Sequence, residues 1–218
     1  MASELLRLLE VMDQLRSPGG CPWDAEQTHQ SLIKYLLEES YEFIDSVDTD
    51  DRRAMREELG DILLQVYFHA RIAQEHATDP FSIEDVARGI ADKLVRRHPH
   101  VFGEESVDST TEVQQNWEKL KAAEKNRASA TDGIALSQPA LPLITKLIYR
   151  AEKNGIDLSG KLGLPTAEVN NDVPAEIAIS DALVAAVVAA IKQGIEPEDL
   201  LRARAREISD EIKRIESL

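Results

Sequence analysis

The sequence predicts an all-α protein built as a helical bundle. Apolar residues recur at helical spacing along most of the chain, whereas the alternation typical of strands is scarce. Leu, Ile, Val, Ala, Glu, Lys and Arg dominate the composition, which favours helices. Breaker clusters such as Ser17-Pro18-Gly19-Gly20 and Asp79-Pro80 divide the chain into segments of helical length.

The first half contains five predicted helices. The first covers about 3–16 and is followed by a loop, CPWDAEQ. The second covers about 28–47, and a short acidic turn that can cap a helix separates it from the third, at about 51–77. Ser82 is a suitable N-cap for a fourth helix, which must stop before Pro99. Ser109 and Glu112 have capping-box spacing and open a fifth helix that runs to about residue 125.

The second half is smaller. Residues 127–139 are small and polar, so we expect a linker or mobile loop there. A helix follows at about 140–154, then an irregular stretch over 155–173, then helices at about 174–193 and 197–217. This organisation predicts a larger N-terminal unit over 1–126 and a smaller C-terminal unit over 140–218.

Charge and cysteine content limit the possible functions. The formal net charge of −15 argues against binding to nucleic acid or to an anionic membrane. Cys21 is the only cysteine, so no intramolecular disulfide can form. The longest apolar run, 182–191, is too short to cross a bilayer. We therefore expect a cytoplasmic protein.

Acidic residues gather on two consecutive helices. In LEESYEFIDSV, Glu38, Glu39 and Glu42 share one helix face, which by itself is typical of a solvated acidic stripe. In EELGDILLQV, however, Glu58 and Asp61 lie one turn apart among apolar neighbours. Helices joined by so short a turn pack as an antiparallel hairpin, so the two acidic faces can converge.

Converging carboxylates repel one another unless a cation neutralises them. Ligands that are all oxygen suit Mg²⁺, or Mn²⁺ in its place. Gly60, between Glu58 and Asp61, weakens its helix, which a close approach of backbone or ligand would explain. Because protein-bound Mg²⁺ commonly takes phosphate oxygens as ligands, the sequence also predicts a phosphorylated substrate.

A basic island, DKLVRRHPHVFG, lies in this acidic chain. Lys93, Arg96 and Arg97 share a helix face and are either favourable cations at a helix C-terminus or a phosphate clamp. Trp117 and Lys121 lie one turn apart, where a base can stack and a phosphate can bind, although a lone helical tryptophan is more often part of a core. Trp23 is open to the same two interpretations.

The five segments GCPWDAEQT, LEESYE, EELGDILLQV, DKLVRRHPHVF and NWEKLKAAEK, in this order and spacing, resemble the MazG family of nucleoside triphosphate pyrophosphohydrolases. The resemblance spans about residues 3–126, and EExxE followed by ExxD is its most specific part. It implies an all-α, Mg²⁺-dependent enzyme that hydrolyses NTPs and dNTPs to the monophosphate and pyrophosphate. It also implies a homodimer with broad base specificity. Its role would be either the housecleaning of noncanonical nucleotides or the control of nucleotide pools during stress, and the residues do not choose between the two.

The resemblance also implies roles for individual residues. Glu39, Glu42, Glu58 and Asp61 match the metal ligands. Glu38 matches a neighbouring acid, and Glu38 or Glu39 would accept the proton of the attacking water. The remaining matches concern substrate binding, with phosphate contacts expected from Lys93, Arg96, Arg97 and Lys121, and the nucleotide pocket from Trp23 and Trp117.

The second half departs from the family pattern, in which full-length members carry two related units. AISDALVAAVVAA resembles the ExxD helix, but Ala178 takes the place of its Glu and only Asp181 remains. No second EExxE helix is recognisable. We therefore expect 140–218 to be a degenerate, non-catalytic repeat.

Two other functions are compatible with these residues. One is a different enzyme on the same scaffold, a dUTP/dCTP diphosphatase or a phosphoribosyl-ATP pyrophosphohydrolase. The other is a non-catalytic protein that senses nucleotides. The RRHPHVF segment and the fifth motif favour the MazG family over the first, and the intact carboxylate set argues against the second.

Overall fold

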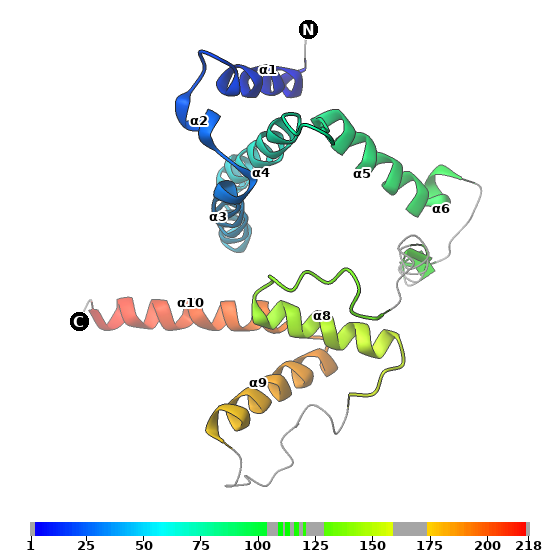
Figure 1. Cartoon of the computed structure of the whole chain (residues 1–218). Coiled ribbons are helices and arrows are strands. Elements are labelled where there is room, and N and C mark those ends of the chain that lie inside the picture. Colours follow the sequence, from blue (N-terminus) through cyan, green and yellow to red (C-terminus); the bar gives the residue numbers. More distant parts are fainter. Residues whose placement is uncertain are drawn as a thin grey trace. The chain divides into compact units, whose positions relative to one another are not determined.

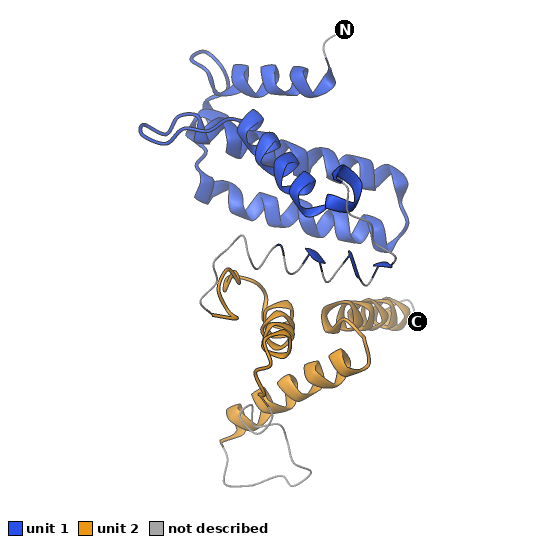
Figure 2. Cartoon of the chain, turned by 90° about the vertical axis from the view of Figure 1, so that its right-hand side faces the viewer, with its two compact units in different colours: residues 1–120 blue, residues 121–218 orange. Residues whose placement is uncertain are grey.

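A computed structural model describes residues 3–103, 109–110, 112–113, 116–117, 120, 129–158 and 174–216. Every regular element within those residues is a helix, which confirms the predicted all-α class (Figure 1). The chain divides into two compact units, 1–120 and 121–218 (Figure 2). No helix in these ranges has the length and apolar run that a membrane span requires.

Unit 1 begins with α1 (Glu4–Arg16), α2 (Pro22–Glu26) and α3 (His29–Asp48). Ser3 caps α1, since its side chain accepts a hydrogen bond from the Leu6 amide. The sequence predicts a loop where α2 forms, and this prediction is wrong. Proline is favourable at the first position of a helix and Asp24 lies in the first turn, so one helical turn forms there.

The other helices of unit 1 are α4 (Arg52–Ala73), α5 (Ile83–Arg97) and α6 (Pro99–Phe102). Asp51 caps α4 by accepting hydrogen bonds from the Arg53 and Ala54 amides, as the acidic turn predicts. The predicted end of this helix near residue 77 is wrong, because the chain tightens after Ala73, where the Glu75 and His76 amides donate to carbonyls only three residues before them. Ser82 caps α5 through a capping box with Asp85.

The core of unit 1 lies among α1, α3 and α4. Met12 and Leu32 are each 1% exposed, and Tyr67 and Phe68 complete the buried cluster. The α3 and α4 helices form the most extensive helix pair, an antiparallel hairpin (Figure 2). Leu32 and Phe68 determine which faces of α3 and α4 meet. The same packing therefore determines where the carboxylates on these two helices lie.

Unit 2 consists of α8 (Ala140–Lys153), α9 (Ala175–Lys192) and α10 (Pro197–Glu216). The α8 helix packs against both α9 and α10. Ile148, Ala151 and Val187 are buried in this unit, and so is Ile134 from the predicted linker segment. The start of the predicted irregular stretch, 155–158, is free of helix, and the rest of it lies outside the described residues.

Candidate metal centre

The α3–α4 hairpin holds the predicted carboxylates. Thr28 and Ser31 form a capping box that starts α3, with Thr28 Oγ1 accepting from the Ser31 amide at 3.1 Å and the Thr28 amide donating to Ser31 Oγ at 2.9 Å. Asp51 fixes the start of α4. The caps set where each helix begins, and packing around the core places the middle of α3 opposite the first half of α4.

Three carboxylates converge across this hairpin. Glu39, Glu58 and Asp61 each offer an oxygen, and these oxygens lie within 4.8 Å of one another. All three side chains are half-buried. Glu42 is more exposed but lies close enough to Glu58 to interact through a hydrogen bond. Glu38 is exposed at the edge of the group.

The electrostatics of the cluster are those of uncompensated negative charge. Partial burial raises the pKa of Glu39, and the nearby charges of Asp61, Glu42, Glu58 and Glu38 raise it further. The pKa of Glu58 is raised by desolvation, and then by Glu42 and Asp61. The largest causes of both shifts all raise the pKa, and none of them is a cation. The ionised cluster therefore favours a bound cation.

This donor set fits a hard divalent metal. Carboxylate oxygens from two helices offer the all-oxygen coordination that Mg²⁺ and Mn²⁺ prefer, with no imidazole or thiolate in the group. Glu39, Glu58 and Asp61 would hold the ion, and Glu42, the fourth predicted ligand, lies outside this group of three but next to Glu58. A Cβ on Gly60 would meet nothing within 4 Å among the described residues, so no close approach within this chain accounts for that glycine.

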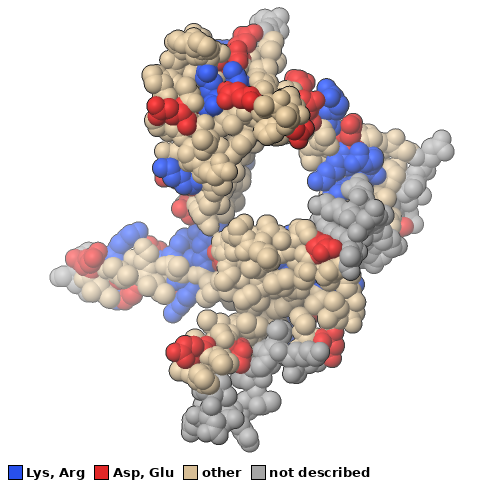
Figure 3. All heavy atoms as spheres, viewed as in Figure 1, with Lys and Arg blue, Asp and Glu red and all other residues tan. Residues whose placement is uncertain are grey.

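The predicted basic residues lie near the end of α5, where Figure 3 shows Lys and Arg side chains gathered. Lys93 is half-buried and Arg96 is exposed. Arg97, in contrast, is only 4% exposed, and its guanidinium lies 5.3 Å from the centre of the Trp117 ring. His98 also meets that ring edge-on, with the ring centres 4.9 Å apart. Lys121 lies outside the described residues.

Trp23 lies on α2, with half of its surface exposed. Its ring meets Tyr35 edge-on at 6.0 Å between ring centres. Tyr35 is four residues, or one helical turn, before Glu39 on α3. This aromatic pair thus lies one turn from the carboxylates. Tyr35 is not among the predicted site residues, although its spacing from Glu39 could have revealed it.

In unit 2, the residues in the ExxD-like positions lie on α9. Ala178 is exposed and Asp181 is half-buried. The described residues of this unit contain no group of three or more potential ligands like the one on α3 and α4.

Comparison with known proteins is consistent with these motifs. The family model described as the MazG nucleotide pyrophosphohydrolase domain matches residues 27–102, which include all five carboxylates. A protein of Thermotoga maritima named nucleoside triphosphate pyrophosphohydrolase/pyrophosphatase MazG is 38% identical over 222 residues, spanning 97% of this chain and 85% of its own length. The chain belongs to the MazG family.

Other similar proteins differ in how much of the chain they share. An uncharacterized 26.1 kDa protein of Streptomyces cacaoi is 43% identical over 98% of this chain and 83% of its own length. The nucleoside triphosphate pyrophosphohydrolase of Escherichia coli K12 is 43% identical over 71% of this chain and 60% of its own. A crystal structure of a MazG-related protein from Thermotoga maritima covers 53% of this chain and 97% of its own, with 29% identity and a TM-score of 0.45.

Proposed function

We propose that this protein is a Mg²⁺-dependent nucleoside triphosphate pyrophosphohydrolase, which hydrolyses NTPs and dNTPs to the monophosphate and pyrophosphate. The observation that carries the proposal is the convergence of Glu39, Glu58 and Asp61 in a chain of the MazG family. Relatives that match 97% and 71% of this chain carry nucleoside triphosphate pyrophosphohydrolase activity in their names. We further propose broad base specificity and a housecleaning role.

The carboxylates of the α3–α4 hairpin would have two roles, metal binding and proton transfer. Glu39, Glu42, Glu58 and Asp61 would hold Mg²⁺, which when bound neutralises phosphate charge and lowers the pKa of a coordinated water. Glu38 or Glu39 would accept the proton of the water that attacks the α-phosphorus, because the raised pKa of Glu39 makes it a better base than an ordinary carboxylate. The exposed position of Glu38 leaves it free to reach that water.

The other assigned residues would bind the substrate. Trp23 would stack on the base, since half of its surface is exposed beside Tyr35. Lys93, Arg96 and Lys121 would contact phosphates. Arg97 and Trp117 form a mutual contact, and through it they would shape the wall of the nucleotide pocket.

We also propose that the active form is a homodimer. Ile33, Leu37 and Tyr41 follow one another at every fourth residue on α3, and each remains 52% exposed in the single chain. An apolar stripe of this length on a helix is typical of a surface that a partner covers. Residues 1–126 would be the catalytic unit and 140–218 a degenerate, non-catalytic repeat, since Asp181 has no acidic partner at 178. Sedimentation equilibrium measures the assembly.

The decisive experiment measures the products from a panel of NTPs, dNTPs and damaged analogues with Mg²⁺ or Mn²⁺. We expect monophosphate and pyrophosphate in equal amounts, and ¹⁸O from labelled water in the monophosphate. Release of inorganic phosphate and a diphosphate would contradict the proposed bond cleavage. Nucleotide binding without any product would instead indicate a sensing protein.

A further inference from the structure

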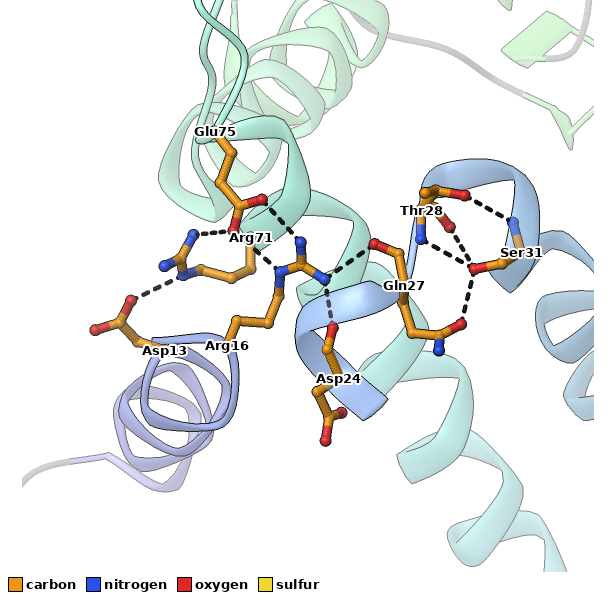
Figure 4. Close-up of polar contacts among 8 residues, drawn as sticks. All are labelled: Asp13, Arg16, Asp24, Gln27, Thr28, Ser31, Arg71 and Glu75. Carbon is orange, nitrogen blue, oxygen red and sulfur yellow. Dashed lines mark hydrogen bonds and ion pairs between the residues drawn. The ribbon is translucent and has the colours of Figure 1, made fainter. Parts of the chain in front are cut away.

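Arg16, the last residue of α1, has no role in the proposed chemistry, yet its side chain is only 4% exposed. Its guanidinium forms a bidentate pair with Glu75, from Nε to Oε1 at 3.1 Å and from Nη2 to Oε2 at 2.8 Å (Figure 4). Its remaining nitrogen, Nη1, donates to the carbonyls of Asp24 at 2.5 Å and Gln27 at 3.1 Å. Planar guanidinium geometry is what allows one side chain to make all four bonds.

This guanidinium joins the end of α1 to α2 and to the end of α4, which is 59 residues further along the chain. Glu75 lies just beyond α4, and the Arg16 pair, together with Arg71, lowers the pKa of its carboxyl. Arg71 on α4 donates both to Glu75 and to Asp13 on α1. The Arg16 guanidinium also lies 5.6 Å from the centre of the Phe68 ring, at the unit 1 core. Arg16 therefore ties α2 to the α1–α4 core.

The segment that Arg16 holds has little stability of its own. A helix of five residues is far too short to be stable in isolation, and α2 has no side-chain N-cap. Its entry is fixed by the amide of Cys21, which donates to the Leu15 carbonyl at 2.8 Å. Its exit is fixed by Arg16, which binds the carbonyls of Asp24 and Gln27. Trp23 lies between these two anchors.

We propose that Arg16 is a positioning residue for the substrate, acting through Trp23. By holding the C-terminal end of α2 against the α4 end, it sets the Trp23 ring against Tyr35, one turn from Glu39. The ring then presents its exposed half to the base of a nucleoside triphosphate. This inference rests on the proposed function, because it assigns Trp23 to the substrate.

The test compares R16Q and R16K with the wild-type chain in the pyrophosphate-release assay. We expect R16Q to raise KM about tenfold, since base stacking on Trp23 becomes less favourable. We expect kcat to change by less than about twofold, because the carboxylates do not move. R16K keeps the charge opposite Glu75 but not the planar fork, so its KM should lie in between. The matched control is R88Q, which removes an exposed ion pair with Asp85 on α5.

A second measurement reports directly on Trp23. In a W117F background Trp23 is the only tryptophan, and R16Q should increase quenching of its fluorescence by acrylamide. An R16Q protein with wild-type KM and wild-type quenching would overturn the proposal. The proposal would also be overturned if R16Q lowered only the Tm and the fraction of active molecules and left KM and quenching unchanged. If the wild-type chain releases no pyrophosphate, the proposed function fails, and the quenching measurement still decides whether Arg16 positions Trp23.

Discussion

Replacing Asp61 by asparagine should have opposite effects on the metal-free and the Mg²⁺-bound protein. The substitution keeps the size of the side chain and removes one charge from a cluster whose oxygens lie within 4.8 Å. At that separation, Asp61 and Glu39 repel by about 0.9 kcal/mol even with the dielectric constant of bulk water. Relief of this repulsion should raise the Tm of the chelated protein by about 3 °C.

The same substitution should weaken metal binding. The Coulomb attraction between a divalent cation and a carboxylate oxygen about 2.1 Å away is about 4 kcal/mol, again with the dielectric constant of bulk water. The amide of D61N keeps an oxygen ligand but not the charge, so we take half of that gain, about 2 kcal/mol, as lost. This corresponds to Mg²⁺ affinity about 30-fold weaker.

Thermal unfolding in chelator and in a Mg²⁺ titration measures both effects, and pyrophosphate release from a dNTP measures the consequence for activity. The matched control is D92N, which removes the same charge from an exposed position on α5. A D61N protein that Mg²⁺ stabilises as strongly as the wild type, with undiminished pyrophosphate release, would refute the assignment of this cluster as the metal site.

Two further predictions concern pH and glycine. The pKa values of Glu39 and Glu58 are raised in the folded chain, in part by Asp61, so their ionisation costs stability at neutral pH. In chelator, the Tm of the wild type relative to that of D61N should therefore rise as pH falls from neutral toward the usual carboxyl value of 4.5, since the pKa shifts of His69 and Glu75 are common to both proteins. A Tm difference that stays constant over that range contradicts the repulsion argument. A Cβ on Gly20 would collide with the carbonyl oxygens of Gln14 and Leu15, whereas one on Gly89 meets open space in α5. By urea unfolding, we expect G20A to lose about 2 kcal/mol and G89A to gain about 0.5 kcal/mol, and equal effects would show that the turn before α2 tolerates a side chain.

Much of the fold could be predicted because the signals for helices are local. The capping residues Ser82 and Asp51 and the breakers before α2 and after α5 are readable without any tertiary contact. The α2 helix could not be predicted in the same way. A single turn has almost no intrinsic stability, and its carbonyls are satisfied by Arg16 from another helix.

For the site, the sequence determined which acids share a face of one helix, since the helical period fixes the grouping of Glu38, Glu39 and Glu42 and of Glu58 and Asp61. The family resemblance named Glu39 and Glu42 as ligands with Glu58 and Asp61, and only the tertiary structure decided that it is Glu39 whose carboxylate lies within 4.8 Å of the other two. It also decided that Arg97 is buried beside Trp117 and that Arg16 holds the Trp23 segment. The reason is that the helical period determines only which residues of one helix share a face. The rotation and offset between two helices are set by core packing around residues such as Leu32 and Phe68.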